Sequence, residues 1–269
     1  MSRKVSVIIT CYNYGQYLDE ALDSVYNSNY DNFEVIIVND GSDDINTIDK
    51  LNDIKKRGYK NLSILDQDNS GVVKARNNGF KLSTGGYVVF LDADDKIDRN
   101  YISKCAQALD SNPSISFVYT DSIFFNEKKQ VKIFNLEYNF YSLLFRNYIP
   151  ITSMIRREAF SSVGGYKQCN YEDWELYINL AENGFIGYYL NEYLFFYRIH
   201  GNSKQKKDDI DKEKNILQIK DIHKDLYNKE TLKKIKEESY KDNLNFIKKE
   251  IFRIVRAIII RYRIKLVMY

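Results

Sequence analysis

Short apolar runs that end in polar residues recur along the first part of the chain. They occupy residues 4–10, 33–38, 62–65 and 87–91. Uninterrupted apolar runs of this length are typical of strands that are buried on both faces of a sheet. Segments with apolar residues at helical spacing lie between them, at about 18–25, at about 44–57 and from 72 onward. This alternation predicts an α/β fold with a mostly parallel sheet flanked by helices.

The pattern is less regular in the middle of the chain. It predicts a helix at about 99–110, a strand at 117–121, a strand at 149–157 that feeds a short helix, a helix from 171 and a last strand at 193–200. Residues 123–148 are rich in aromatic side chains without a clean period. This stretch fits either packing in the core, which we favour, or a surface on which sugar rings stack.

The composition changes after residue 203. Residues 1–203 carry 21 basic and 26 acidic side chains, a net charge of −5, whereas residues 204–269 carry 19 basic and 11 acidic ones, a net charge of +8. We therefore expect one domain at 1–203 and a helical extension at 204–269, with helices at about 208–228 and 230–244. An acidic body with a basic tail argues against nucleic-acid binding and for a tail that meets something anionic.

The last stretch of the extension, 246–269, has apolar residues on one helical face and basic residues on another. The basic residues include Arg253, Arg256 and Arg263, which argue against a membrane-spanning helix. Such a helix fits an anionic membrane surface. It fits equally well a helix that docks on the domain or on a second copy of the chain, so both interpretations stay open.

The cysteines and the N-terminus indicate a reducing compartment. The three cysteines, Cys11, Cys105 and Cys169, are odd in number and widely spaced, which favours neither a disulfide framework nor a zinc site. The N-terminus lacks a signal-peptide pattern, and no apolar run approaches membrane-spanning length. We expect a cytoplasmic protein, peripheral on the inner face of the cell membrane if the extension binds lipid.

Three carboxylates, Asp92, Asp94 and Asp95, follow directly on the fourth apolar run. Open α/β sheets bind their ligands at the carboxyl ends of the strands. Clustered negative charges repel each other unless a cation is present, and hard oxygen ligands suit Mg²⁺ or Mn²⁺ held against substrate phosphates. A solvated acidic turn that caps the next helix explains the same residues without a ligand.

The first strand-to-helix turn, 10–16, lacks the glycine patterns of dinucleotide-binding and P-loop proteins. It offers the ring of Tyr12 instead, which can stack on a nucleobase, and Asp40 after the second run can accept from a ring N–H. Ordinary packing is the alternative for Tyr12, because the chain has 23 tyrosines. A turn residue before glycine is the alternative for Asp40.

Four motifs in this half carry a resemblance to a known family. They are Val-Ser-Val-Ile-Ile-Thr-x-Tyr-Asn at 5–13, Val-Asn-Asp-Gly-Ser at 38–42, Gly-x-x-x-Ala-Arg-Asn at 71–77 and Leu-Asp-Ala-Asp-Asp at 91–95. In this order and spacing they resemble the family 2 glycosyltransferases of GT-A fold, of the type that builds bacterial surface polysaccharides. Gly-Gly-Tyr at 164–166, Glu-Asp-Trp-Glu-Leu at 172–176 and Tyr-Arg-x-His at 197–200 fit the same family.

The resemblance implies roles for individual residues. Residues 1–96 would form the nucleotide-sugar half and 97–203 the acceptor half. Binding of the nucleotide sugar falls to Thr10, Tyr12, Asn13, Asp40, Arg76, Asp92 and Ala93. The implied metal ligands are Asp94 and His200, and the implied general base is Asp173. Contacts to the acceptor or the diphosphate are implied for Asp95, Glu172, Trp174, Arg198 and Ser203.

The chemistry of inversion agrees with a base at Asp173. A single displacement needs a carboxylate within hydrogen-bond reach of the attacking hydroxyl. Ordinary capping of the helix that starts here is the alternative for Asp173. A structural role is the alternative for His200.

The sequence therefore indicates an inverting, metal-dependent hexosyl- or N-acetylhexosaminyl-transferase. By resemblance its donor is a nucleotide-diphospho-sugar, most simply a UDP-sugar, its cofactor is Mn²⁺ or Mg²⁺, and its acceptor is a hydroxyl of a glycan or lipid-linked glycan. The alternative is a catalytically inactive sugar-nucleotide-binding or scaffold protein of the same fold, which would need neither the Asp92/Asp94 pair nor Asp173. Nucleotidyl transfer is disfavoured because 10–16 has no glycine-rich basic loop.

Overall fold

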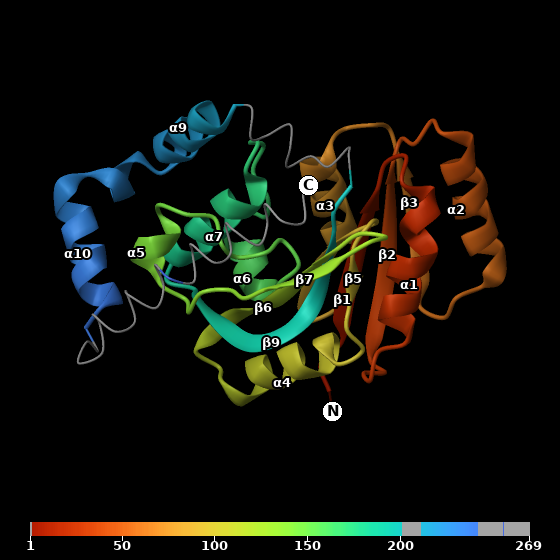
Figure 1. Ribbon diagram of the computed structural model, residues 1–269, viewed down its shortest axis with the longest axis horizontal. Helices are drawn as coiled ribbons and strands as arrows, with labels where there is room; N and C mark the ends of the chain where they lie inside the picture. Colours follow the sequence, from red (N-terminus) through yellow and green to blue (C-terminus); the bar gives the residue numbers. More distant parts are fainter. Residues whose placement is uncertain (1, 201–210, 242–254, 256–269) are drawn as a thin grey trace.

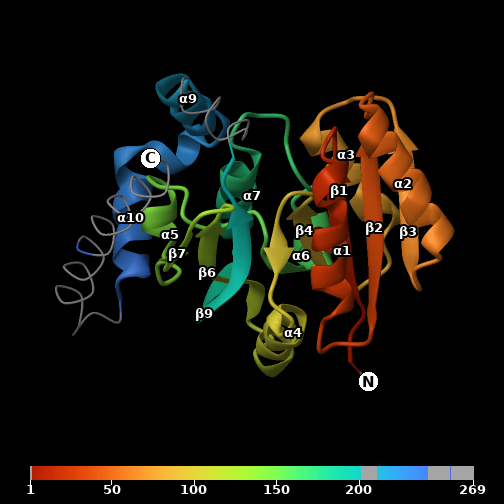
Figure 2. The same cartoon turned by 45° about the vertical axis from the view of Figure 1, so that its right-hand side comes forward.

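One sheet runs through the whole domain (Figure 1). The computed structural model describes residues 2–200 and 211–241, together with Val255. Within these residues the strands follow the order β3-β2-β1-β4-β8-β6-β9-β5, and β7 pairs with β6. The helices of the extension lie at the end of the molecule farthest from α2 (Figures 1 and 2). The predicted amphipathic helix at 246–269 falls outside the described residues, apart from Val255.

The first half of the sheet is parallel, as the apolar runs predict. Its strands are β1 (Val5–Cys11), β2 (Phe33–Asp40), β3 (Leu62–Gln67) and β4 (Tyr87–Asp92). The connections are η1 (Gly15–Tyr17) with α1 (Leu18–Tyr26), then α2 (Ile45–Arg57) and α3 (Val72–Leu82). Along β1, Ile8 packs into one core while Val7 and Ile9 pack into the other. Burial on both faces is the reason that the run is apolar throughout.

The second half of the sheet mixes strand directions. β6 (Ile115–Phe125) and β9 (Ile186–Arg198) are parallel, whereas β8 (Met154–Arg156) runs antiparallel to both β4 and β6. Two short strands, β5 (Lys96–Ile97) and β7 (Gln130–Ile133), pair antiparallel with β9 and β6. The α/β fold with flanking helices is confirmed, and its parallel part lies mainly in the first half.

Two strands of this half differ from the sequence-based expectation. β9 begins at Ile186 instead of 193, because a bulge hides its pattern: Thr120 pairs with Leu190 but Asp121 pairs with Tyr193, which leaves two polar residues outside the ladder. The strand predicted at 149–157 is limited to β8. Its first part contains Pro150, which has no N–H to donate to a ladder.

The remaining helices cover the sheet and build the extension. In the domain they are α4 (Tyr101–Ser111), α5 (Phe140–Leu143), α6 (Arg157–Ser162) and α7 (Glu172–Glu182). In the extension they are α9 (Lys212–Ile222), the 3-10 turn η2 (Lys224–Tyr227) and α10 (Lys229–Ser239). The helix predicted at 208–228 is thus broken after Ile222. Across the described ranges, no helix combines the length and the hydropathy that crossing a membrane requires.

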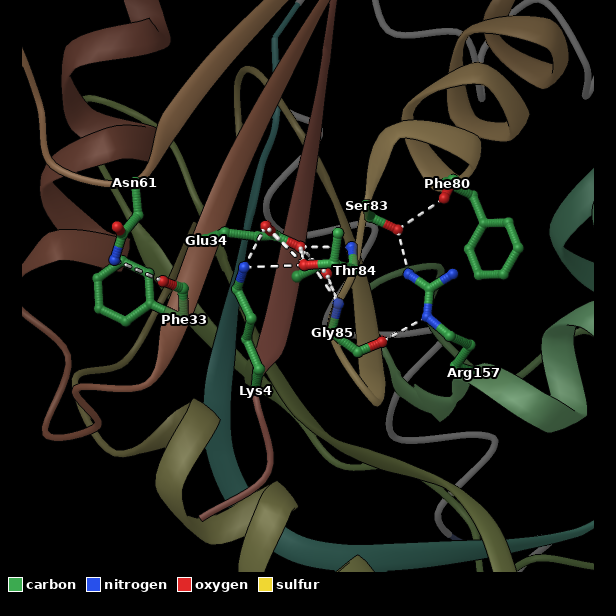
Figure 3. A network of polar contacts seen from close by, with 10 residues as sticks. Lys4, Phe33, Glu34, Asn61, Phe80, Ser83, Thr84, Gly85 and Arg157 are labelled. Atoms are coloured by element: carbon green, nitrogen blue, oxygen red, sulfur yellow. Dashed lines mark hydrogen bonds and ion pairs between the residues drawn. The ribbon is translucent and has the colours of Figure 1, made fainter. Parts of the chain in front are cut away.

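A carboxylate at the amino-terminal edge of the parallel strands ties them together (Figure 3). Glu34 on β2 accepts from Ser6 Oγ at 2.7 Å and from the Thr84 N–H at 2.6 Å, and it pairs with Lys4 Nζ. Burial opposes ionisation of Glu34, but the hydrogen bonds from Lys4, Ser6 and Thr84 outweigh it and lower its pKa from 4.5 to about 2. Beside this network Arg157 donates to the Gly85 carbonyl. The contacts of Glu34 therefore hold together the amino-terminal edge of the parallel strands, which lies opposite the candidate site.

We predict that Glu34→Gln removes an acid-sensitive part of the stability. Because the folded state lowers the pKa of Glu34, its ionised form stabilises the fold above about pH 4.5, and this contribution is lost as the pH falls toward about 2. The variant should have a lower Tm than the wild type at neutral pH, and the gap should close across this window. Thermal unfolding followed by circular dichroism measures both, with the exposed Glu158→Gln as the control. A gap that persists unchanged into acid would contradict the prediction.

Candidate active site

The carboxyl ends of β1 and β4 meet in the middle of the sheet. Thr10 and Asp92 are register partners on these strands, and Thr10 Oγ1 donates to Asp92 Oδ1 at 3.3 Å. The N–H of Ala93 donates to the Thr10 carbonyl at 3.2 Å, which extends the pairing beyond the end of β4. The structure thus brings these three predicted residues together at the ligand-binding edge of the sheet.

A buried arginine links this edge to helix α7. Arg76 on α3 is only 4% exposed; its Nη2 lies 2.7 Å from Asp92 Oδ1, and its Nη1 lies 2.8 Å from Glu172 Oε1. Burial disfavours the charge, but the two carboxylates outweigh it and raise the pKa of Arg76 above its ordinary value. Its guanidinium also lies 5.4 Å from the ring centre of Tyr166. Glu172 is the first residue of α7, so this bridge fixes the start of α7, and with it Asp173, relative to β4.

Asp94 and His200 form a close pair on the other side of Asp92. Asp94 Oδ2 and His200 Nε2 are 2.8 Å apart, and about a fifth of each side chain is exposed. The imidazole packs against the rings of both Tyr14 and Tyr17, at centroid distances of 5.4 and 5.9 Å. Burial, and then the charge of Asp92, raise the pKa of Asp94.

Asp95 is buried behind this pair. Its Oδ1 accepts from the backbone N–H of Arg198 at 2.8 Å, and its Oδ2 has no hydrogen-bond partner in the part of the chain that the structure describes. Burial, and then the charges of Asp94 and Asp92, raise the pKa of Asp95 well above its ordinary range. This raised pKa favours the uncharged form of Asp95, and its contact with the Arg198 backbone helps to hold the turn after β4.

The side chain of Arg198 is engaged by protein groups. Its Nε donates to the Asp94 carbonyl at 2.7 Å, and its Nη2 lies 3.0 Å from Glu20 Oε1. The guanidinium lies 4.5 Å from the ring centres of both Tyr17 and Phe125. In this structure Arg198 supports the turn that carries Asp94, and contact with acceptor or diphosphate remains a prediction.

Asp173 is the second residue of α7. Its Oδ2 accepts from Asn147 Nδ2 at 3.0 Å, and its Oδ1 accepts from the backbone N–H of Trp174 at 2.8 Å. Burial, and then the neighbouring charge of Glu172, raise the pKa of Asp173 against the effect of these hydrogen bonds. A raised pKa makes a carboxylate a better proton acceptor as long as it stays ionised.

Arg76 also ties Asp173 to the end of β4. Its guanidinium contacts Asp92 Oδ1 at 2.7 Å and Glu172 Oε1 at 2.8 Å, and Glu172 directly precedes Asp173 in α7. Carboxylates from α7 and from the end of β4 therefore share one arginine, although the sequence places them about 80 residues apart. Burial, and then the charges of Asp95, Asp94, Asp92 and Asp173, raise the pKa of the Tyr197 phenol above its ordinary value.

Three predicted residues build loops around the site. Asp40 is buried and accepts from Gln67 Nε2 at 2.8 Å and from the N–H groups of Ser70 and Gly71 at 2.8 and 2.9 Å, so both of its oxygens hold the loop before α3. Asn13, with a φ of 57°, accepts from the N–H groups of residues 43 and 44. Tyr12 is 43% exposed at the end of β1, so its ring is open to a ligand.

Trp174 is a buried residue of α7. It is 4% exposed, and its indole N–H donates to the Leu143 carbonyl at 2.6 Å. Its ring packs in the core between α7 and α5, and the acceptor contact implied for Trp174 stays a prediction. Sequence reasoning missed Asn147, which meets Asp173 only in three dimensions. Ser203 lies outside the described residues.

Metal binding would use ligands from the substrate as well as from the protein. Within the described ranges, no three His, Cys, Asp or Glu side chains lie close enough together to hold a metal ion by themselves. The pair Asp94 and His200 supplies two ligands, a hard oxygen and an imidazole. This donor set fits Mn²⁺ or Mg²⁺, which commonly complete their shell with phosphate oxygens and water.

The family model for glycosyl transferase family 2 matches residues 6–164. The chain belongs to this family. An uncharacterized glycosyltransferase of Haemophilus influenzae is 29% identical over 267 residues, which cover 90% of this chain and 75% of that protein. The family match includes every motif from β1 to the end of β4.

Solved structures show the same fold. The 1–349 fragment of S. aureus TarS in complex with UDP-GlcNAc is similar with a TM-score of 0.65 and 21% identity, over 76% of this chain and 60% of that one. The mannosyltransferase PcManGT from Pyrobaculum calidifontis, in complex with GDP-Man and Mn²⁺, is similar with a TM-score of 0.66 and 17% identity, over 100% of this chain and 81% of that one. The domain therefore has the GT-A fold of glycosyltransferases.

We predict that Arg76→Ala strongly destabilises the domain. The change leaves two carboxylates close together around an unfilled space, and breaking a buried ion pair from one side typically lowers the free energy of unfolding by about 3–5 kcal/mol. Urea unfolding measures the loss. Arg57→Ala is the matched control, because Arg57 also bridges two carboxylates, Asp19 and Asp53, but at the surface, and it should change the stability little. Equal effects of the two substitutions would contradict the buried-bridge account.

Proposed function

We propose that this glycosyltransferase moves a sugar from a nucleotide-diphospho-sugar to an acceptor hydroxyl with inversion at the anomeric carbon. The observation that carries the proposal is the bridge by which Arg76 joins Asp92 to Glu172, because it brings Asp173, the next residue of α7, to the strand end that carries Asp92 and Asp94. Two of these groups have different tasks: Asp94 belongs to the donor side with His200, and Asp173 comes from α7 on the acceptor side.

The donor side suits a nucleotide with a diphosphate. Tyr12 offers an exposed ring at the end of β1, and Thr10 and Asp92 lie beside it with hydroxyl and carboxylate oxygens for ribose and sugar. Asp40 contributes by holding the loop before α3. The neighbours TarS and PcManGT were solved with UDP-GlcNAc and GDP-Man, which supports a nucleotide sugar as donor. We take a UDP-sugar as the first donor to test, as the sequence motifs indicate.

The metal is proposed on the chemistry of the pair Asp94 and His200. Together with diphosphate oxygens they would hold Mn²⁺ or Mg²⁺, and PcManGT was solved with Mn²⁺. When bound, such a cation offsets the charge that develops on a departing nucleotide diphosphate. The protein itself contributes orientation, because the imidazole is held by Tyr14 and Tyr17 and the turn after Asp92 is held by Arg198.

The acceptor side rests on Asp173. A hydroxyl that hydrogen-bonds to this carboxylate can lose its proton as its oxygen attacks the anomeric carbon on the face opposite the leaving nucleotide. The ionised carboxylate has a raised proton affinity because it is buried next to Glu172. We propose a glycan or lipid-linked glycan as the acceptor. An inactive sugar-nucleotide-binding protein is disfavoured, since it would have no use for a carboxylate in this position.

We predict that the protein slowly hydrolyses its donor when no acceptor is present, and that this requires Asp94. A panel of UDP- and GDP-sugars with Mn²⁺ or Mg²⁺, scored by released nucleoside diphosphate, should identify one preferred donor. Chelation of the metal and Asp94→Ala should each lower the rate at least about a hundredfold, because the leaving group then lacks charge stabilisation. Binding of donor without any turnover in the wild type would favour the inactive binder instead.

Asp173→Asn should separate binding from chemistry. The amide keeps the shape of the carboxylate and can form hydrogen bonds, but it cannot accept the proton of the attacking hydroxyl or water. The kcat for donor hydrolysis should therefore fall by about 10²–10⁴-fold. The affinity for the donor, measured by calorimetry with the UDP-sugar found in the panel, should change less than about threefold, since Asp173 lies on the acceptor side. A variant that keeps its kcat would show that Asp173 is a structural helix-start residue.

A further inference from the structure

The contact to Asp173 comes from the segment that follows α5. Asn147 is exposed, and its Nδ2 donates to Asp173 Oδ2 at 3.0 Å, while the Trp174 N–H holds Oδ1 at 2.8 Å. A donor on each oxygen fixes the orientation of the carboxylate and favours its ionised form. Without Asn147, Oδ2 would lose this donor, and the Trp174 N–H on Oδ1 would be left to orient the carboxylate.

The segment that carries Asn147 is held in turn by the extension. The hydroxyl of Tyr227 in η2 donates to the Leu144 carbonyl at 2.8 Å. At the end of α10, the Ser239 carbonyl accepts from Asn139 Nδ2, and the Ser239 hydroxyl accepts from the Tyr141 N–H, both at 3.2 Å. α5 accordingly lies between α10 and α7 (Figures 1 and 2).

The extension also holds α7 directly. His223, between α9 and η2, is 4% exposed; its Nδ1 lies 2.8 Å from Glu182 Oε2, and its Nε2 lies 3.3 Å from Glu175 Oε1. Lys167 Nζ meets the same Glu175 oxygen at 2.9 Å. The extension therefore contacts both the helix that carries Asp173 and the segment that carries its hydrogen-bond donor.

We propose that Asn147 is a positioning residue for Asp173, and that residues 211–241 keep Asn147 in place through the contact between Tyr227 and Leu144. The extension then belongs to the acceptor side of the site. The importance of this arrangement for catalysis rests on the proposed function, whereas the effect on Asp173 itself can be measured without any turnover.

Other charged and titratable groups act on Asp173 from the elements around it. They are Glu172 on its own helix, Arg76 on α3, and the phenols of Tyr166, Tyr177 and Tyr197. None of them belongs to the segment between α5 and β8. Replacing Asn147 therefore removes one donor and leaves the rest of the electrostatic surroundings in place.

The direct test is a titration of Asp173 by NMR. In protein labelled with ¹³C at the aspartate carboxyl carbons, the Asp173 signal is the one that disappears in Asp173→Asn. In Asn147→Ala its midpoint should move upward by about one pH unit, because the ionised form loses a charge-assisted hydrogen bond. Asn32→Ala is the matched control. Asn32 is also exposed, and its Nδ2 donates to the Ser2 carbonyl, at the N-terminus of the chain. An unchanged midpoint in Asn147→Ala would overturn the proposal.

Tyr227→Phe tests the part assigned to the extension. Loss of its hydroxyl should move the Asp173 midpoint in the same direction by about half as much, since Asn147 is then only loosened. Tyr26→Phe is the control, because Tyr26 donates to the Lys60 carbonyl over the same 2.8 Å far from the site. A shift in Asn147→Ala without any shift in Tyr227→Phe would overturn the role of the extension and confirm that of Asn147.

Donor hydrolysis adds a second readout. The acidic limb of the pH–rate profile should move upward in Asn147→Ala, so that kcat falls about tenfold in acid and recovers toward alkaline pH, with KM for the donor unchanged. A uniform loss at every pH would indicate structural damage and overturn the positioning role. Absence of hydrolysis with every donor would contradict the proposed function, while the NMR result would still decide the contact between Asn147 and Asp173.

Discussion

The site depends on one buried guanidinium. Arg76 lies between Asp92 at the end of β4 and Glu172 at the start of α7, with almost no exposure to solvent. The ion bridge is tolerated in the interior because each carboxylate has a guanidinium N–H close to it, whereas removing the arginine would leave two uncompensated charges. The planar fork of arginine directs one N–H group to each of the two carboxylates. By this bridge the end of β4 and the start of α7 are held at a fixed separation.

The sheet gives this bridge a rigid base. β1 and β4 are covered on both faces, and their side chains alternate between two cores. Glu34 holds the strands together at the amino-terminal edge of the sheet, whereas polar turns follow the strands at the carboxyl edge. The backbone at the end of β4 is held by the Thr10 and Ala93 contacts. Asp92 pairs there with the Arg76 guanidinium and Asp94 with the His200 imidazole, so neighbouring side chains help these carboxylates to lie close together.

The surroundings of Asp173 are assembled from more distant parts of the chain. Trp174 anchors α7 to the end of α5, and Tyr227 of the extension contacts the next residue, Leu144. The residues of the extension that the structure describes, 211–241, thus pack against the domain.

The sequence by itself determined the parallel half of the fold and the residues at the strand ends. Apolar runs buried on both faces and glycine turns are local patterns, so β1 to β4 and the Asp92–Asp95 turn could be read without coordinates. The family motifs added Asp173 and His200. Only the tertiary structure decided that Trp174 is a core residue, that Asp40 holds a loop, and that Asn147 contacts Asp173. These contacts join segments far apart in the chain, and their energies depend on burial and direction, which no local pattern encodes.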